Sequence, residues 1–224
     1  MFEKINKNKL IGKLQKSFPS SLSEEVGSLC NKLTESDAKK IYYAKSYMWL
    51  GEKLCDYNDG RSWTLSNGEK VYIPYRVYFT SKFSQFYTYS SLTEIEKIIY
   101  HCIFSRSSDG FAREGHLRAL LRIGADRYEW VKPYIISPAG EYVIEMVDVL
   151  YKEISREKIS EYKAFCKLNF ENIRYLHANM ITYWAEFCRN DCYYYRDYIG
   201  KRLFSEFFGM RKSGQKQIEI NEKR

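Results

Sequence analysis

The sequence predicts a mainly α-helical fold, and three observations support that prediction. Apolar residues recur at helical spacing along most of the chain, and residues 93–124 form two amphipathic helical patterns joined by Ser107-Ser108-Asp109-Gly110. Only one stretch, 61–80, shows the alternation of a strand. Similar helix pairs recur about every 30–45 residues, which is typical of a HEAT-like or armadillo-like stack; an irregular helical bundle is the alternative.

The first third of the chain is expected to contain three helices. Residues 2–18 give a basic amphipathic helix that Pro19 ends, and residues 20–23 can cap a short second helix that reaches about Leu33. A third, long helix with a broad apolar face is predicted over 38–57.

A β-hairpin is predicted near 61–79. Asn67-Gly68 is a strong two-residue turn signal, and the flanking residues predict strands over 62–65 and 70–73. Pro74 cannot donate a ladder hydrogen bond, so the second strand is expected to end there or to lie at an edge. The fold class is therefore mainly α with one inserted hairpin.

The rest of the chain is expected to be helical. After the 93–124 helix pair, Asp126 can cap a helix that ends at Pro133. Three further helices are predicted over 141–154, 158–190 (one long helix or two that abut) and 192–208. We expect a single helical domain over 1–210 and a mobile, polar, basic tail over 211–224.

Charge and aromatic content restrict the kinds of partner. The net charge is +8, but five lysines and one glutamate fall within residues 1–18, and residues 211–224 are also basic. Basic termini indicate weak attraction to phosphate more than a dedicated nucleic-acid groove. The 21 tyrosines either line helix interfaces or form a semi-polar contact face.

No targeting or membrane segment is expected. The N-terminus lacks the apolar core of a signal peptide, and no run approaches the roughly 18 apolar residues of a spanning helix. We therefore expect a cytoplasmic protein with no membrane association. Six cysteines are then interpreted as reduced, mostly buried thiols, at positions 30, 55, 102, 166, 188 and 192.

The sequence offers no catalytic or metal-binding pattern that we would defend. Cys188 and Cys192 lie four residues apart with His177 upstream, but the second close pair of a structural zinc site is absent from the sequence. His101 and Cys102 are sequence neighbours and would point about 100° apart on a helix. Phosphate-binding glycine loops are also absent. We expect a protein that is not an enzyme and needs neither cofactor nor metal.

Arginines form the most interesting candidate binding group. Arg113, Arg118 and Arg122 are expected to make a rough stripe on the second helix of the pair. They could form internal ion pairs with Asp109, Glu114 or Glu141, contact an acidic protein partner, or bind nucleic acid. The candidate binding residues are Arg76, Arg106, Arg113, His116, Arg118 and Arg122.

Three stretches resemble a pattern in a family of uncharacterised bacterial helical proteins. They are WTLSNGEKVYIPYRVYF (63–79), CIFSRSSDGFAREGHLRALL (102–121) and WVKPYIISPAGEYVIEM (130–146). That family pattern usually has histidine where this chain has Ser107 and Ser108, and the resemblance covers under half of the chain. The turn at 109–113 is also loosely similar to the turn between helices of a HEAT repeat. The resemblance implies a helical fold and no particular activity.

Helix pairs, abundant tyrosine and the lack of a catalytic pattern favour a non-catalytic protein–protein interaction module. An adaptor, or an inhibitor or immunity protein of a bacterial system, would fit. The alternative is a nucleic-acid-binding helical-repeat protein that uses its basic termini and the arginine stripe. An enzyme whose site is assembled only by the fold is a third class.

Overall fold

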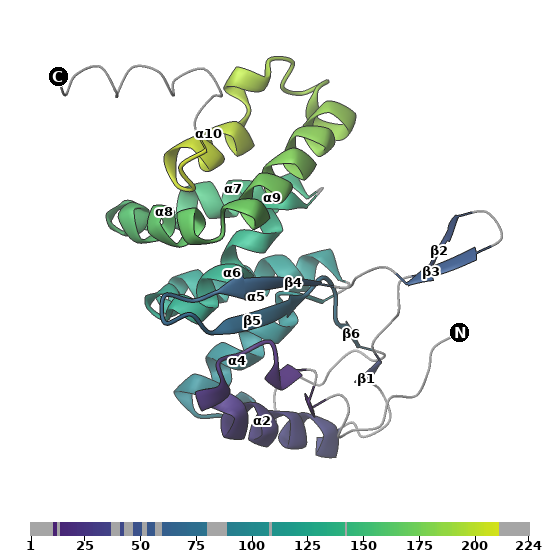
Figure 1. Ribbon diagram of the computed structural model, residues 1–224, viewed down its shortest axis with the longest axis vertical. Helices are drawn as coiled ribbons and strands as arrows, with labels where there is room; N and C mark the ends of the chain where they lie inside the picture. Colours follow the sequence, from purple (N-terminus) through teal and green to yellow (C-terminus); the bar gives the residue numbers. More distant parts are fainter. Residues whose placement is uncertain are drawn as a thin grey trace. The chain divides into compact units, whose positions relative to one another are not determined.

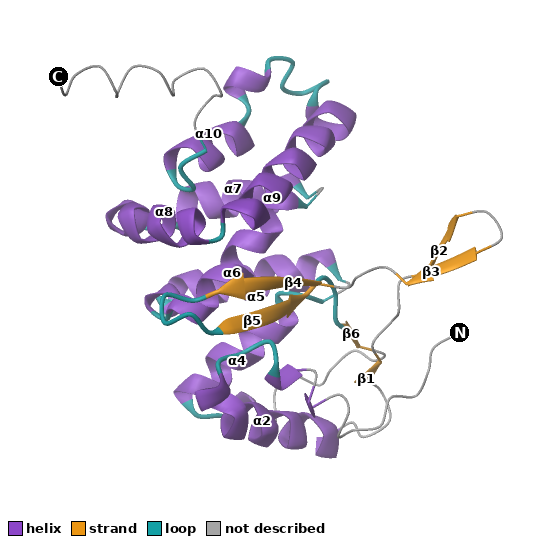
Figure 2. Ribbon diagram, viewed as in Figure 1, coloured by secondary structure: helices purple, strands orange, loops and turns teal. Residues whose placement is uncertain are grey.

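The computed structural model describes most of the chain, and its helices dominate (Figures 1 and 2). The chain divides into two compact units, unit 1 over 1–138 and unit 2 over 139–224. The prediction of a mainly helical fold with an inserted hairpin is confirmed. The predicted single domain over 1–210 stays a prediction, and the predicted tail lies outside the described residues, which are 11–12, 14–36, 41–42, 47–50, 53–56, 60–79, 89–107, 109–141 and 143–210.

The N-terminal helices of unit 1 are fastened by a buried carboxylate. A 3₁₀ turn η1 (Ser20–Leu22) leads into α2 (Ser23–Ser36), as expected after Pro19. Lys32 and Ser28 of α2 both hydrogen-bond to Glu96 of α4 (Glu94–Phe104), at 2.6 and 2.8 Å. Glu96 also accepts from the Thr93 backbone N–H and so completes a capping box at the start of α4.

The long helix predicted over 38–57 is wrong where the structure describes that segment. Its described parts are strands: β1 (Ile41–Tyr42), β2 (Tyr47–Leu50) and β3 (Lys53–Asp56). β2 and β3 pair antiparallel with Tyr47 opposite Asp56. The apolar run that suggested a helix is rich in aromatic residues, which favour strands, and it is followed by Gly51, which costs about 1 kcal/mol inside a helix.

The hairpin prediction is confirmed nearly to the residue. β4 (Gly60–Thr64) and β5 (Lys70–Pro74) pair antiparallel with Trp63 opposite Val71. Gly68 has φ +86°, in the left-handed region that the turn requires. Trp63, Val71 and Ile73 are buried, so one face of the hairpin packs on the core of unit 1. A third, two-residue pair joins β1 to β6 (Tyr78–Phe79).

The predicted helix pair is present as α4 and α5 (Gly110–Arg122), which pack on each other (Figure 1). Asp109 caps α5 by accepting from the N–H groups of Phe111 and Ala112. The capped helix predicted from Asp126 to Pro133 is wrong. The chain instead forms η2 (Ala125–Arg127), η3 (Glu129–Val131) and α6 (Lys132–Ile136), because proline is tolerated in a first helical turn.

The secondary-structure elements of unit 2 are all helices in its described residues. η4 (Ser137–Gly140) spans the boundary between the units. Asn169 separates two abutting helices, which decides between the two alternatives left open for 158–190. The last predicted helix is shorter than expected and begins at Ile199. The elements of this unit are α7 (Ile144–Glu153), η5 (Arg156–Lys158), α8 (Ile159–Leu168), α9 (Phe170–Tyr183), the π-helix η6 (Trp184–Cys188), η7 (Tyr195–Asp197) and α10 (Ile199–Glu206).

Aromatic residues make up a substantial part of the core of unit 2. Tyr162, Phe204 and Phe207 are fully buried, and α10 packs against α7. Gly200 allows α10 to approach α9, because a Cβ atom there would lie 2.9 Å from the sulfur of Met180. In the described part of the chain, the helices are too short or too polar to cross a bilayer.

Candidate functional site

Two of the candidate arginines are buried inside unit 1 and bind backbone carbonyls. Arg106 donates from Nε to the carbonyl of Pro74 at 3.1 Å and from Nη2 to that of Tyr75 at 2.7 Å. Arg113, which is 1% exposed, donates from Nη1 to the carbonyl of Ser107 at 3.0 Å. Arg106 therefore holds the residues that follow β5, and Arg113 holds the turn between α4 and α5. A parallel bridge between Val77 and Ser107 connects the same two segments.

The predicted arginine stripe does not form along α5. Arg113 and Arg118 are five residues apart, so their side chains point about 140° away from each other. Arg113 faces the core, whereas Arg122 is exposed and Arg118 is half-buried in an ion pair with Glu114 at 2.9 Å. Arg76 is separate again, because its guanidinium lies over the ring of Tyr75 at 4.3 Å.

His116 takes part in an unexpected hydrogen-bonded chain in unit 1. Its Nδ1 atom lies 2.8 Å from Nδ1 of His101, and Nε2 of His101 lies 2.9 Å from the hydroxyl of Tyr89. The rings of Tyr100 and Phe104 pack against His116 at 5.4 and 5.2 Å. Sequence reasoning compared each histidine only with its neighbours in the chain, and missed that the helix pair folds position 116 back onto position 101.

The environment keeps this histidine pair neutral at pH 7. Burial lowers the pKa of both His101 and His116 from 6.5 to about 4, and the charge of His101 lowers that of His116 further. Burial also raises the pKa of Tyr89. The described residues include no group of three histidine, cysteine or carboxylate side chains that could hold a metal ion. The pair is thus best understood as a polar link between helices, in which His101 is buried and His116 is half-buried.

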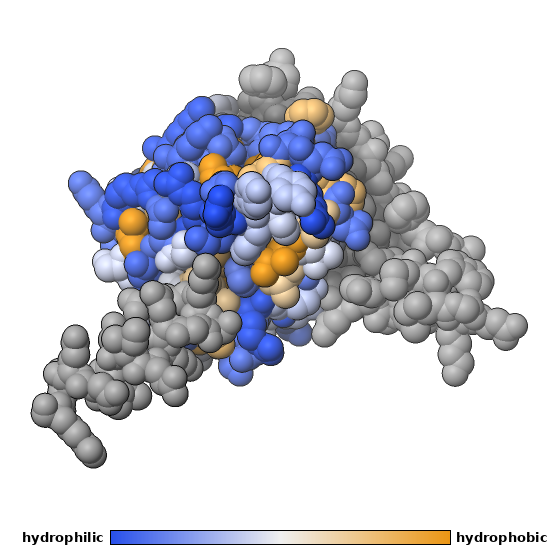
Figure 3. Space-filling view, turned by 90° about the horizontal axis from the view of Figure 1, so that it is seen from above, coloured by the Kyte–Doolittle hydropathy of each residue, from blue (hydrophilic) through white to orange (hydrophobic). Residues whose placement is uncertain are grey.

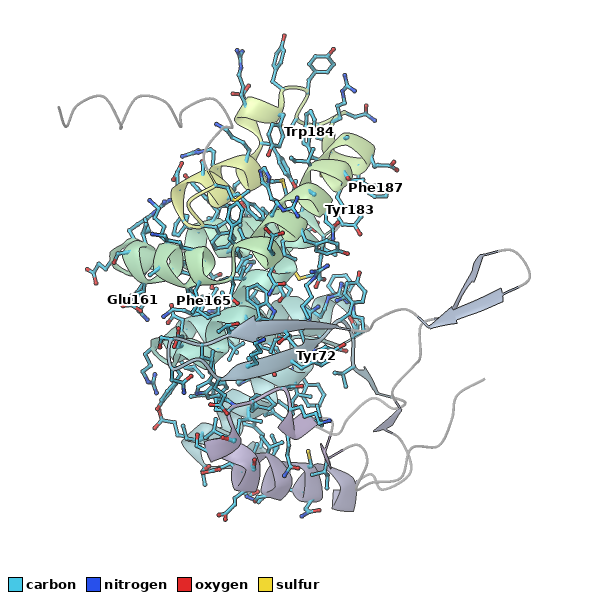
Figure 4. All side chains as sticks on the ribbon, viewed as in Figure 1. Tyr72, Glu161, Phe165, Tyr183, Trp184 and Phe187 are labelled. Carbon is cyan, nitrogen blue, oxygen red and sulfur yellow. The ribbon has the colours of Figure 1, made fainter. Side chains whose placement is uncertain are left out.

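The most exposed aromatic group of unit 2 lies between α9 and α10. We call it the aromatic surface and define it as Tyr183, Phe187, Tyr193 and Tyr194 with Arg189 and Arg196. The side chains of Phe187, Tyr193 and Tyr194 are 61%, 63% and 57% exposed. Figure 4 labels Tyr183 and Phe187 at the end of α9 and in the π-helix that continues it.

The side chains of the aromatic surface contact one another in pairs. The rings of Tyr183 and Phe187 stack at 6.3 Å, and those of Tyr193 and Tyr194 meet edge to face at 5.1 Å. Arg189 lies over the Tyr193 ring at 5.4 Å, and Arg196 lies over the Tyr194 ring at 4.8 Å. Both guanidinium groups are thus within the range of a cation–π contact with a ring.

Below the aromatic surface, a second set of rings anchors the segment to the core of unit 2. The indole N–H of Trp184 donates to the carbonyl of Cys192 at 2.9 Å, and its ring contacts that of Tyr195 at 5.1 Å. Tyr195 hydrogen-bonds to His177, which packs on Phe204. The π-helix at 184–188 is a kind of backbone that is often found at functional sites.

The cysteines of the rejected zinc pattern belong to this anchor. Cys188 is buried and hydrogen-bonds to Tyr198, and burial raises the pKa of its thiol. The Cys192 thiol lies 3.6 Å from the carbonyl of Tyr194. Their contacts are those of packed thiols.

Charges on the surface segment nearly balance. Residues 183–197 contain two arginines, at 189 and 196, and three carboxylates, at 186, 191 and 197. Arg196 and Asp197 form a loose ion pair at 3.6 Å. Figure 3 likewise shows small apolar patches set among polar residues on the face that it displays. A balanced, aromatic segment suits a protein surface better than a polyanion.

One sequence signal could have found the aromatic surface. Tyr193, Tyr194 and Tyr195 are consecutive, and successive residues of a helix point about 100° apart, so all three cannot face one core. The predicted helix over 192–208 contains all three rings, so at least one of them must lie outside its buried face. The comparisons with family models, curated proteins and solved structures found no match for the chain.

Proposed function

We propose that the protein is a non-catalytic protein-interaction module and that the aromatic surface of unit 2 is its contact site. One observation carries the proposal: three large aromatic side chains, each more than half exposed, stand on a segment that is bonded internally to the core. Tyrosine, tryptophan and arginine dominate binding hot spots, and rigid aromatic side chains lose little conformational entropy on binding. An adaptor or an inhibitor would both use such a surface.

The arrangement of charge favours a protein over nucleic acid as the partner. Arg106 and Arg113 donate hydrogen bonds to backbone carbonyls inside unit 1, and Arg118 forms an ion pair with Glu114. The arginine stripe that suggested nucleic-acid binding therefore does not form one exposed basic group. Residues 183–197, which bear the aromatic surface, contain two arginines and three carboxylates, so this segment would gain little from phosphates. Exposed tyrosines can nevertheless stack on bases, so the test includes that outcome.

The role we propose is non-catalytic because the histidines described above make packing contacts and hydrogen bonds within their own unit. The histidine pair of unit 1 is neutral, with His101 buried and His116 half-buried, and His177 of unit 2 is hydrogen-bonded to Tyr195. A general base needs a reacting proton within hydrogen-bond reach. In the described part of the chain, these imidazoles hydrogen-bond to each other or to tyrosine hydroxyls.

Photo-crosslinking in the protein's own cells tests the proposal. A benzophenone amino acid replaces Phe187 or Tyr193 in the full-length chain, and a third variant carries it at Phe111, which is 90% exposed but lies in unit 1. We expect one discrete protein adduct from positions 187 and 193, resistant to nuclease, and none from position 111. Adducts to nucleic acid, or equal protein labelling from all three positions, would contradict the proposal.

A further inference from the structure

A chain of three side chains links three successive parts of unit 1. Tyr89 precedes α4, His101 lies in the last turn of α4, and His116 lies in the middle of α5. The two contacts are 2.9 Å from the Tyr89 hydroxyl to Nε2 of His101 and 2.8 Å between the Nδ1 atoms of the histidines. The ring centroids of the two imidazoles are 5.0 Å apart. The contact between the two imidazoles is a polar contact between α4 and α5.

The count of protons shows why these three hydrogen-bonded side chains tolerate one extra proton but not two. In a hydrogen bond between two Nδ1 atoms, one must carry hydrogen and the other must accept. A single imidazolium at His101 can still donate to His116 and to Tyr89. When both rings are protonated, two N–H groups face each other across 2.8 Å and two positive charges share a buried site. The second proton therefore breaks the link.

Among the described residues, no carboxylate hydrogen-bonds to either imidazole to offset that charge. Tyr100 packs on both imidazoles, and Lys97 lies over the Tyr89 ring at 5.4 Å. In the part of the chain that the structure describes, the only hydrogen bonds of the two imidazoles are those to each other and to Tyr89. The remaining charged groups on α4, α5 and the elements packed against them do not hydrogen-bond to either imidazole: they are Glu24, Glu25, Lys32, Glu94, Glu96, Arg113, Glu114, Arg118, Arg122, Asp126, Arg127 and Lys132.

We propose that the Tyr89–His101–His116 chain is an acid-sensitive latch, which holds α5 on α4 while both imidazoles are neutral and lets α5 open when both are protonated. The proposal is independent of the contact made by unit 2. It assigns the histidine pair a conformational role, with the proton as the ligand that the open state binds more tightly.

Linkage gives the size of the effect. In the open state both imidazoles are hydrated and titrate near 6.5, whereas burial holds the pKa of each near 4 in the closed state. The open state therefore binds more protons between these values, and stability of the closed state falls as the pH falls. From pH 7.5 to pH 5 the opening constant should rise roughly 30-fold for each histidine and roughly 1,000-fold for both.

Hydrogen exchange on the full-length chain tests the latch. Protection of the α5 amides, corrected for the intrinsic pH dependence of exchange, should fall roughly 1,000-fold between pH 7.5 and pH 5. In His116→Phe, whose ring can pack against Phe104 but cannot be protonated, the fall should shrink to roughly 30-fold. The matched control is His177→Gln in unit 2, which should leave the α5 change as in the wild type.

A second readout keeps the proposal falsifiable if His116→Phe packs poorly. Histidine side-chain resonances of the wild-type protein should show two imidazoles that stay neutral down to about pH 5 and then titrate with the loss of α5 protection. Titration of both near 6.5 with α5 still protected would overturn the latch. An α5 change of equal size in the wild type and in a folded His116→Phe would overturn it as well.

Discussion

The hydroxyl of Tyr195 lies 3.1 Å from Nε2 of His177, and this contact connects the base of the aromatic surface to α9. The imidazole then packs on Phe204 with ring centroids 5.0 Å apart. Tyr195 also contacts Trp184, whose indole binds the carbonyl of Cys192. The exposed rings therefore stand on a continuous set of buried and half-buried contacts, which is why we regard the surface as preorganised.

Removing the Tyr195 hydroxyl should weaken unit 2. Tyr195→Phe keeps the ring against Trp184 but leaves the imidazole of His177 without this partner, at a cost of about 1–2 kcal/mol. Urea unfolding followed by a probe in unit 2 measures the loss. Tyr194→Phe is the matched control, because the Tyr194 side chain is 57% exposed, and it should change stability by less than about 0.5 kcal/mol. Equal losses in the two variants would show that the anchor is not the hydroxyl contact.

Arg106 should be essential to the hairpin exit, whereas Arg122 should be dispensable. Arg106→Met removes donors to the carbonyls of Pro74 and Tyr75 and should destabilise unit 1 by about 2–4 kcal/mol. Hydrogen exchange of the β4–β5 peptides is the appropriate measurement, since it reports this region directly. Arg122→Met, on the exposed face of α5, should leave those peptides unchanged. A stable Arg106→Met hairpin would contradict the structural role given to this arginine.

Two glycines should respond to alanine in opposite ways. A Cβ atom at Gly60 would lie 2.3 Å from the carbonyl oxygen of Ile73, so Gly60→Ala must distort the start of β4 and lower stability. A Cβ atom at Gly115 of α5 would meet nothing within 4 Å. Gly115→Ala should therefore raise stability by about 0.5–1 kcal/mol through helix propensity. Thermal unfolding of both variants checks the signs, and a stabilising Gly60→Ala would refute the close approach of the two strands.

The carboxylate of Glu96 should make the α2–α4 contact sensitive to acid. Burial raises the pKa of Glu96, but hydrogen bonds from Lys32, Thr93 and Ser28 outweigh it and leave the pKa below its usual value. The folded state therefore holds the ionised form, and its stability is complete above the unfolded pKa and is lost as the pH falls through the folded one. Glu96→Gln should be less stable at pH 7 and less dependent on pH below 4.5, measured by urea unfolding at each pH. An unchanged pH dependence would argue against the contact.

The sequence was most informative where local signals and tertiary packing agree. Asn67-Gly68 defines the hairpin, and Thr93 and Asp109 mark the starts of α4 and α5 by capping. The sequence-based prediction was wrong over 38–57, because an apolar run is compatible with a helix or a strand. In the structure, part of this run pairs as β2 and β3. The prediction also misplaced Arg113, because the five-residue step to Arg118 crosses from the buried to the exposed face of α5.

The candidate surfaces were harder to predict for a different reason. Contact between His101 and His116 depends on how α5 turns back on α4, and neither spacing nor composition specifies that angle. The exposure of Tyr193 and Tyr194 depends on the π-helix that ends α9 and on the 3₁₀ turn that follows. Both are irregular elements without a strong sequence signature.

The central claim is that the protein binds a partner protein through the aromatic surface. The most direct measurement is the affinity of the full-length chain for the protein that crosslinks at position 187 or 193, with Phe187→Ser and Tyr193→Ser compared with Phe111→Ser. The account predicts dissociation constants at least about tenfold weaker for the first two and an unchanged value for the third. If Phe111→Ser weakens binding and the unit 2 variants do not, the contact lies in unit 1 and the account is wrong.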